Sequence, residues 1–360
     1  MRTISSASIA VLACLTLALA AHAAARPAAP AKAVPAAAAP AAPDTVDLII
    51  LHVNDVHGQT QPVTEDGRSL GGYARLATAV DEIRKANRGT RVFLFHAGDE
   101  FSRGDDLTRA TKGAANIAIM NRLKFDAWTP GNGDFYDGPA ELLDRISEAN
   151  FHCLAANVRY KDPDEPVGKP YYMEEAGPVR VAVVGLCRLS VDDPSFGKFV
   201  MADPTETARR VVAEVRPRAD LVVALTHLGA LTDQRLAGAV QGIDLVIGGH
   251  SHSAMTAGRV AKSPDGRDVL IAQAGEQLRY LGVVRVKMEK TATGYRLKEA
   301  AASLVPLDEK VKLDAAITAL IARLAEQAGK SARPAEKPAA PAPTPAPAAP
   351  AEPKAPVPVG

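Results

Sequence analysis

Polar side chains of the kinds that bind divalent metal ions stand at or just after the ends of apolar runs in this sequence. The candidate metal ligands are Asp55, His57, Asp99, Asn132, His227, His250 and His252. Carboxylate, imidazole and amide oxygen donors suit borderline ions such as Mn, Fe, Co, Ni or Zn better than Ca or Mg. The set is larger than one tetrahedral ion needs, which indicates two divalent metal ions that share a bridging carboxylate.

Two pairs of these candidates are separated by a single residue. Asp55 and His57 form one pair, and His250 and His252 form the other. Since side chains at positions i and i+2 of an extended chain point the same way, we expect each pair to face one metal cluster. A single Asp-x-His motif is weak evidence, because polar residues after strands often cap helices or bond loop amides. The joint occurrence of the candidates, in order and all after apolar runs, favours a metal site.

Other histidines and the two core cysteines have plainer interpretations. His52 and His96 lie inside apolar runs, and we expect them, together with His152, to be core histidines with a hydrogen-bond partner. Cys153 and Cys187 also lie in apolar runs. Export would permit a disulfide between them, and two buried free thiols agree equally well with the sequence.

The elements that must position the candidates follow an alternating pattern. Strand-like apolar runs are expected at 46–53, 91–98, 151–158, 179–187, 219–227 and 243–250, and helices at 72–87, 113–123, 205–216 and 230–240. This alternation predicts an α/β fold whose sheet is covered on both faces. Functional groups in such folds gather outside the carboxyl ends of the strands.

Hairpin-like strands at 268–274 and 281–289 and a final amphipathic helix complete the predicted domain. The helix is expected over 312–328, with Leu313, Ile317, Leu320 and Leu324 on one stripe and Gly329 as its stop.

The amino-terminal residues 1–23 have the pattern of a signal peptide. Arg2 precedes an apolar run that ends in Ala21-His22-Ala23. The run is shorter than the roughly 20 apolar residues that a membrane-spanning helix needs, so no transmembrane segment is expected. Cys14 lies inside the run, which disfavours a lipid anchor. We therefore expect a periplasmic or secreted protein.

Ala/Pro-rich stretches flank a predicted domain at 45–330. They form a linker at 24–44 and a tail at 331–360. Such composition cannot bury a core, so we expect solvated extended tails, with tethering to the cell envelope as the alternative. The net charge of +1, without a long basic run in the core, gives no support for binding a nucleic-acid polymer.

Several longer motifs together resemble the 5′-nucleotidase branch of the calcineurin-like metallophosphoesterases. They are LHVNDVHG, GGYARLATAV, HAGDEFSRG, NRLKFDAWTPGN, LAANV, LTHLG, IGGHSH and QAGEQLRYLGVVRV, within about residues 47–290. The resemblance implies a four-layer α/β/β/α sandwich, a small phosphorylated substrate and a two-metal centre. By motif, Asp55, His57, Asp99 and His252 would hold one ion, and Asp99, Asn132, His227 and His250 the other. Asp99 would bridge the two.

One loop departs from the family pattern. The family reads GNHEFDYG or close to it, whereas this chain reads GNGDFYDG at 131–138. The family's catalytic histidine and aspartate are thus Gly133 and Tyr136, so the catalytic acid or base is unknown. We expect an enzyme that is slowed and favours good leaving groups, with Tyr136, Asp137 or His96 as candidate substitute donors.

The leading hypothesis is an exported dinuclear-metal-dependent phosphoesterase that hydrolyses small phosphomonoesters or diesters. The family's nucleotidases carry a carboxyl-terminal domain that binds the nucleotide. Here an Ala/Pro tail follows instead, so no basis for nucleotide specificity is expected. The alternatives are a non-catalytic metal or phosphate-binding module, and a two-metal hydrolase of a different ester such as a sulfur or phosphonate substrate.

Overall fold

The structure is a computed structural model that describes residues 42–188 and 194–331. These residues belong to a compact unit that begins at Ala42. The predicted signal peptide, nearly all of the linker and nearly all of the tail lie outside the described residues, so these boundaries stay predictions. Among the helices of the described residues, none combines the length and the apolar character that crossing a membrane requires.

Two six-stranded sheets form the centre of the unit. The first has the order β16 (Gly294–Pro306), β15 (Tyr280–Thr291), β1 (Thr45–Val53), β4 (Arg91–His96), β5 (Ala127–Trp128) and β6 (His152–Cys153). Strands β1, β4, β5 and β6 run parallel, so their carboxyl ends meet at one edge. Strands β15 and β16 form an antiparallel hairpin at the side of this sheet.

The second sheet has a similar arrangement. Its order is β13 (Arg259–Lys262), β14 (Asp268–Ala272), β12 (Leu245–Ile247), β11 (Leu221–Thr226), β9 (Val179–Leu186) and β8 (Tyr171–Ala176). The four inner strands are parallel, and the two outer ones pair antiparallel. A small hairpin pairs β2 (Val63–Glu65) with β3 (Arg68–Leu70), and a two-stranded antiparallel sheet pairs β7 (Val158–Tyr160) with β10 (Phe199–Met201).

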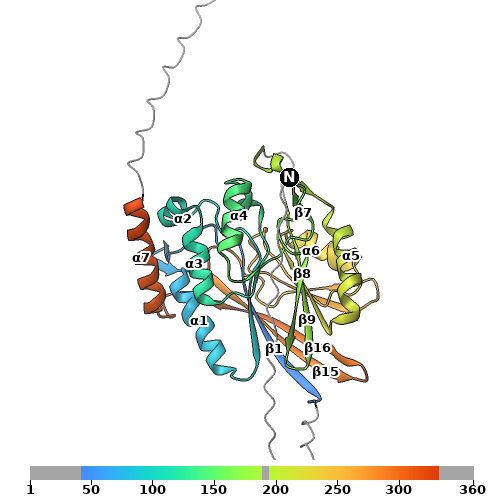
Figure 1. Cartoon of the computed structure of the whole chain (residues 1–360). Helices are drawn as coiled ribbons and strands as arrows, with labels where there is room; N and C mark the ends of the chain where they lie inside the picture. Colours follow the sequence, from blue (N-terminus) through green and yellow to red (C-terminus); the bar gives the residue numbers. More distant parts are fainter. Residues whose placement is uncertain (1–41, 189–193, 332–360) are drawn as a thin grey trace, which may run out of the picture. The chain divides into compact units, whose positions relative to one another are not determined.

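Helices cover the outer faces of both sheets (Figure 1). The α-helices are α1 (Tyr73–Ala86), α2 (Asp106–Thr111), α3 (Ala114–Leu123), α4 (Pro139–Glu148), α5 (Pro204–Val215), α6 (Ala230–Ala239) and α7 (Ala315–Ser331). The 3-10 helices are η1 (Asn132–Phe135), η2 (Pro194–Lys198) and η3 (Arg216–Arg218). Helices α1, α3 and α7 lie on one side of the strands, and α5 lies on the other (Figure 1).

Alternation along the strands creates the layers. In β1, Ile49 and Leu51 join the core under α1 and α3, whereas Leu48 and Ile50 join the core between the two sheets. A third core lies between the second sheet and helices α5 and α6. The predicted α/β/β/α sandwich is therefore confirmed.

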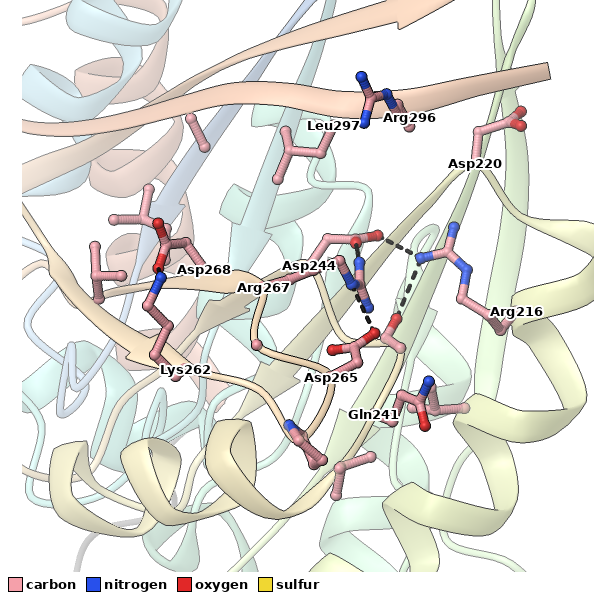
Figure 2. A pocket seen from close by; sticks show the side chains of 18 of the residues that line it. Arg216, Asp220, Gln241, Asp244, Lys262, Asp265, Arg267, Asp268, Arg296 and Leu297 are labelled. Atoms are coloured by element: carbon pink, nitrogen blue, oxygen red, sulfur yellow. Dashed lines mark hydrogen bonds and ion pairs between the residues drawn. The ribbon is translucent and has the colours of Figure 1, made fainter. Parts of the chain in front are cut away.

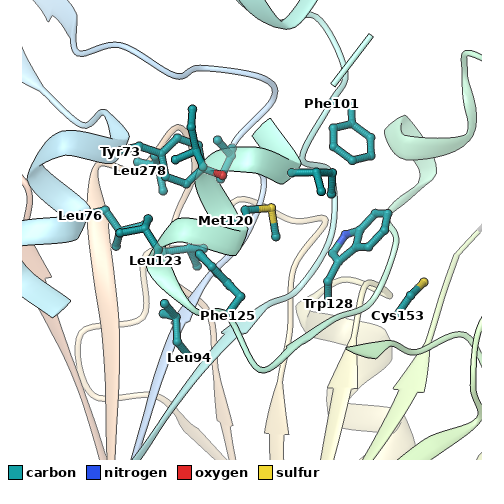
Figure 3. Close-up of a cluster of buried hydrophobic side chains, with 14 of the residues drawn as sticks. Tyr73, Leu76, Leu94, Phe101, Met120, Leu123, Phe125, Trp128, Cys153 and Leu278 are labelled. Atoms are coloured by element: carbon teal, nitrogen blue, oxygen red, sulfur yellow. The ribbon is translucent and has the colours of Figure 1, made fainter. Parts of the chain in front are cut away.

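The core beside the first sheet holds the largest buried rings (Figure 3). Trp128 of β5 packs edge-on against Phe101, with ring centroids 5.4 Å apart. Phe101 follows β4 closely in the chain, and Trp128 lies in β5 just before η1. This contact therefore fixes the two loops that carry Asp99 and Asn132.

Three expected elements differ from the structure. Of the predicted strand at 243–250 only Leu245–Ile247 (β12) forms, and the last helix begins at Ala315, so Leu313 lies outside it and is 48% exposed. The predicted strand over 151–158 is wrong for most of its length, because only His152–Cys153 pair in the first sheet before the chain leaves for β7. Gly329 does not stop the last helix, which continues to Ser331. One glycine in a helix costs only about 1 kcal/mol, too little to end a helix on its own. Asp314 caps the amino end by accepting a hydrogen bond from Ile317 N at 2.8 Å.

Candidate metal centre

All the predicted metal ligands converge at the carboxyl edges of the two sheets. Asp55 and His57 follow β1, Asp99 follows β4, Asn132 begins η1 after β5, His227 follows β11, and His250 and His252 follow β12. Hydrogen bonds between loops hold the two edges together, among them His250 N to Asp55 Oδ2 at 2.8 Å. Ligands that span about 200 residues of sequence thus occupy one site.

One half of the site contains Asp55, His57 and His252. The Nε2 atoms of the two imidazoles are 3.0 Å apart. Asp55 Oδ1 lies 3.3 Å from His252 Nε2 and 3.9 Å from His57 Nε2. These three atoms surround a point at which one cation fits.

The other half contains Asp99, Asn132, His227 and His250. Asp99 Oδ1 lies 3.4 Å from His227 Nε2. His250 Nδ1 lies 2.9 Å from Asn132 Oδ1. The rings of His227 and His250 meet edge-on with centroids 5.2 Å apart.

Both buried carboxylates stand between the two halves. Asp99 Oδ1 faces His227, while its Oδ2 lies 4.0 Å from His57 Nδ1. Asp55 Oδ1 is also 3.9 Å from His227 Nε2. By distance alone the two ligand groups share Asp55, since one group is Asp55, His57 and His252 and the other is Asp55, Asp99 and His227.

The backbone around the ligands is a series of left-handed turns. Positive φ angles occur at Asp55 (52°), His57 (51°), Asp99 (58°), His250 (76°) and His252 (52°). Side chains therefore converge through tight turns, and the extended-chain argument for the two i, i+2 pairs is wrong in its reason. Non-glycine residues in sparsely populated backbone regions cost about 1–3 kcal/mol each and cluster at functional sites.

Hydrogen bonds orient three of the imidazoles. Nδ1 of His57 lies 2.9 Å from Ser102 Oγ, and Nδ1 of His252 lies 3.0 Å from Glu276 Oε2. Nδ1 of His227 donates to the carbonyl oxygen of Ala97 at 2.7 Å. Each contact leaves Nε2 directed into the site, as is usual for a histidine that binds a metal ion.

Unpaired atoms show that the donors fit a divalent cation. Asp55 Oδ1 and His227 Nε2 are buried and have no hydrogen-bond partner among the described residues. When His57 and His252 donate their Nδ1 protons to Ser102 and Glu276, their two Nε2 lone pairs face each other. A cation between them removes this repulsion and satisfies the buried oxygen and nitrogen.

The electrostatics of the site demand positive charge. Burial opposes ionisation of Asp99, but His227 and His57 outweigh it and hold the pKa of Asp99 well below its usual range. Burial alone would lower the pKa of His227, yet Asp99 and Asp55 raise it to about 10. The pKa of His250 is lowered to about 4 by burial and by the positive charges of His227 and Arg188. A proton on His227 thus supplies the charge that a metal ion would supply.

Comparison with known proteins agrees with this geometry. The family model described as calcineurin-like phosphoesterase matches residues 48–254. The chain belongs to the calcineurin-like phosphoesterase family. It is 31% identical to bovine 5′-nucleotidase over 301 residues, which cover 74% of this chain and 52% of that protein.

Solved structures of two other proteins are similar to this chain in fold. The 5′-nucleotidase precursor from Thermus thermophilus has a TM-score of 0.69 at 28% identity, covering 79% of this chain and 59% of that chain. The calcineurin-like phosphoesterase YfkN from Bacillus subtilis has a TM-score of 0.65 at 22% identity, covering 79% and 98%. The present chain spans about half the length of the curated relatives that it matches.

The departure from the family loop is built into the packing. A Cβ atom at Gly133 would lie 2.3 Å from Ser102 Oγ and 2.6 Å from Ser102 Cβ. Ser102 is itself buried. At position 133 this chain therefore lacks the family's imidazole, and the side chain of Ser102 occupies the space that a larger residue would need.

The three candidate substitute donors have different positions. Tyr136 lies at the site, because its Oη accepts a hydrogen bond from Asn132 Nδ2 at 3.0 Å. Asp137 is exposed, and its charge acts on Lys112. His96 is buried, with Nε2 bonded to Glu100 Oε2 at 2.7 Å. Of the three, only Tyr136 directly contacts a predicted metal ligand, so the hypothesis that His96 donates to the substrate is wrong.

The remaining core histidines agree in part with expectation. His52 is buried, but its Nδ1 has no partner among the described residues, so the predicted hydrogen bond is absent there. His152 stacks on Tyr172 with ring centroids 4.4 Å apart. Cys153 and Cys187 are both buried free thiols, and burial raises the pKa of Cys187 to about 12.

Several supporting residues were missed by sequence reasoning. Asp134 accepts hydrogen bonds from the backbone N–H groups of Asp99, Glu100, Phe101 and Gly131 at 2.7–2.9 Å. It therefore ties the two ligand loops to each other. Its signal was its place in the glycine-rich loop, where a buried carboxylate can collect amide protons.

Arg188 was also missed. It follows β9, beside β11, and its exposed side chain pairs with no carboxylate among the described residues. Its charge lowers the pKa of His250, after the larger effects of burial and His227. The rule that polar residues after strands gather at the site would have found it.

A groove of about 1280 Å³ lies away from the metal centre (Figure 2). Its lining includes Asp220 and Asp244, which immediately precede β11 and β12. Asp244 Oδ2 accepts from Arg216 at 2.6 Å, and its Oδ1 accepts from Arg267 at 2.7 Å. The groove thus lies at the amino ends of strands whose carboxyl ends carry the histidines.

Proposed function

We propose that this chain is a dinuclear-metal-dependent phosphoesterase that hydrolyses small phosphomonoesters or diesters. One observation carries the proposal: buried carboxylate and imidazole atoms without partners among the described residues converge at the carboxyl edges of two sheets. Membership of the calcineurin-like phosphoesterase family supports the same chemistry.

Asp55, His57 and His252 would hold one divalent ion, and Asn132, His227 and His250 the other. Asp99 would bridge them, as the family resemblance implies, and its Oδ1 lies 3.4 Å from His227 Nε2. Asp55 Oδ1 is close enough to both halves to assist. The donor set suits Mn, Zn, Fe, Co or Ni.

Bound divalent ions supply Lewis acidity for the phosphoryl group and lower the pKa of a water nucleophile. The protein contributes a rigid frame. Glu276 and Ala97 O keep Nε2 of His252 and His227 directed inward. Asp134 fixes the loops of Asp99 and Asn132.

The absence of the family histidine at Gly133 predicts a slower enzyme that favours substrates with good leaving groups. Positioned acid–base catalysis typically contributes about 10²–10⁴-fold. Small phosphomonoesters or diesters are the proposed substrates, in line with the phosphoesterase family of the chain. The signal-like residues 1–23 support export to the periplasm or medium, with tethering through the Ala/Pro tails as a further proposal.

Hydrolysis of p-nitrophenyl phosphate by the Mn²⁺-loaded chain tests the proposal. We expect turnover in the wild type and background rates in Asp99→Asn, which loses the charge between the two halves. Metal content should be measured on both proteins. A wild type that binds two ions per chain but shows no turnover would overturn the proposal in favour of a metal or phosphate-binding module.

The slowed-enzyme proposal needs a paired substitution, because Gly133→His alone collides with Ser102. We expect Ser102→Gly with Gly133→His to fit the imidazole and raise turnover by about 10²-fold for phenyl phosphate, whose phenoxide is a poor leaving group. Ser102→Gly alone is the matched control. Unchanged turnover in a folded, metal-loaded double variant would contradict the idea that a missing histidine limits the rate.

A further inference from the structure

Tyr136 presents a free hydroxyl proton beside the metal centre. Its Oη accepts the Nδ2–H of Asn132 at 3.0 Å, so its own O–H proton must point elsewhere. Among the described residues, no acceptor takes this proton. The Oδ1 atom of the same Asn132 amide lies 2.9 Å from His250 Nδ1. The hydroxyl therefore stands one hydrogen bond away from a predicted ligand.

The aromatic ring is held in place, yet one side stays open. Tyr136 directly follows η1, and its N–H bonds Gly133 O at 3.4 Å. Its ring lies 6.0 Å, centroid to centroid, from the buried ring of Phe196. The side chain is nevertheless 39% exposed. A substrate can reach the hydroxyl without displacing a core residue.

Neighbouring groups leave Tyr136 without a competitor in this loop. Ser102 closes the space beside Gly133. The carboxylate of Asp134 is buried and occupied by backbone N–H groups. Tyr136 is thus the side chain of the 131–138 loop that combines contact with a ligand, solvent access and a free donor.

We propose that Tyr136 is a catalytic residue whose O–H donates a hydrogen bond to a non-bridging oxygen of the substrate's phosphoryl group. This inference rests on the proposed phosphoesterase function. The hydroxyl lies beside a metal ligand, so the oxygens that it can reach are those held at the centre itself. Negative charge is spread over these oxygens in the transition state, and one well-placed donor there is worth about 10²–10³-fold in kcat.

Asn132 offers a competing explanation for the same contact. Tyr136 Oη could act only by orienting the Asn132 amide so that Oδ1 faces His250. Tyr136→Phe would then weaken metal binding, and saturating metal would restore activity. The catalytic assignment instead requires a loss that saturating metal does not restore.

The test compares Tyr136→Phe with the wild type at saturating Mn²⁺. Tyr171→Phe is the matched control, because Tyr171 lies in β8, on the outer side of the second sheet, and its hydroxyl bonds Glu214 of α5. We expect Tyr136→Phe to lower kcat about 10²-fold, and by the same factor for p-nitrophenyl phosphate as for phenyl phosphate. An unchanged kcat, recovery at higher Mn²⁺, or a loss confined to phenyl phosphate would overturn the proposal, the last by indicating proton donation to the leaving oxygen.

Binding of inorganic phosphate gives a readout that does not depend on turnover. Calorimetric titration of the Mn²⁺-loaded proteins should show affinity for phosphate about tenfold weaker in Tyr136→Phe than in the wild type and Tyr171→Phe, because one hydrogen bond to a charged group is lost. Equal affinities would overturn the contact. If the wild type has no turnover, the phosphoesterase proposal fails, and this titration still decides whether Tyr136 contacts a bound phosphoryl oxygen.

Discussion

Polar side chains at the two ends of strands β11 and β12 differ in whether their buried atoms have hydrogen-bond partners. At the carboxyl ends, His227 and its neighbours leave buried atoms without partners among the described residues. At the amino ends, Asp244 is 3% exposed, but its oxygens accept from Arg216, Arg267 and the N–H of Val222. Strand β11, with its six residues, separates the two edges by about 20 Å.

This difference distinguishes a site from a structural ion-pair cluster. A buried polar group is satisfied in almost every native protein, so an unpaired group at a functional edge points to a missing binding partner. The groove at the amino edge is large and rich in charge, yet its charges neutralise one another (Figure 2). The size and charge of a groove are therefore insufficient to identify the candidate functional site in this protein.

Substitution of Asp244 should cause the largest loss of stability among these predictions and should leave activity unchanged. Asp244→Ala removes one acceptor from each of two guanidinium groups, together with the carboxylate that accepts from the buried Val222 N–H. We expect the free energy of unfolding to fall by about 3 kcal/mol, while kcat of the folded protein stays unchanged. Urea unfolding and p-nitrophenyl phosphate turnover measure the two quantities.

The control is Lys262→Ala, which breaks an exposed pair with Asp268 and should change stability by less than about 1 kcal/mol. A loss of turnover in Asp244→Ala would break the comparison, because the groove would then take part in activity.

Metal removal should affect the opposite edge. At a free Mn²⁺ concentration of about 100 times Kd, binding to the folded state adds about 2.7 kcal/mol to stability. Chelation with EDTA should remove this increment in the wild type and in Asp244→Ala equally. Thermal unfolding with and without chelator would show it, and an increment that persists in Asp99→Asn would place the stabilising metal elsewhere.

His52 shows that a buried atom without a hydrogen-bond partner does not by itself mark a binding site. Burial lowers its pKa from 6.5 to about 4, and no cluster of ligands surrounds it among the described residues. Below pH 6.5 the unfolded chain binds a proton at His52, whereas the folded chain binds it only near pH 4. The free energy of unfolding therefore decreases as the pH is lowered through this range. Between about pH 7.5 and pH 5 the loss from this residue is about 2 kcal/mol.

His52→Gln should flatten this part of the pH dependence, measured by urea unfolding at both pH values. The slope, rather than the absolute stability of the variant, is the informative quantity. An identical slope in the variant would mean that another group titrates in this range.

The fold class and the full set of candidate ligands could be predicted from the sequence, because both depend on local pattern. Apolar runs that alternate with amphipathic stretches determine a layered α/β fold, and parallel strands bring their carboxyl ends to one edge. Short elements were harder to predict. The apolar run at 151–158 resembles a strand, but pairing ends after Cys153, and only the neighbouring strand decides that.

The tertiary structure alone decided how the ligands and their neighbours face one another. Positive φ angles at Asp55 and His57 replace the extended geometry that the spacing suggested, since contacts between distant loops sustain the strained turns. Ser102 closes the space at Gly133 through packing that no local pattern encodes. Tyr136 reaches Asn132 across the single turn of η1. Residue types determine which chemistry is available, whereas close packing of segments far apart in sequence determines which side chains can perform it.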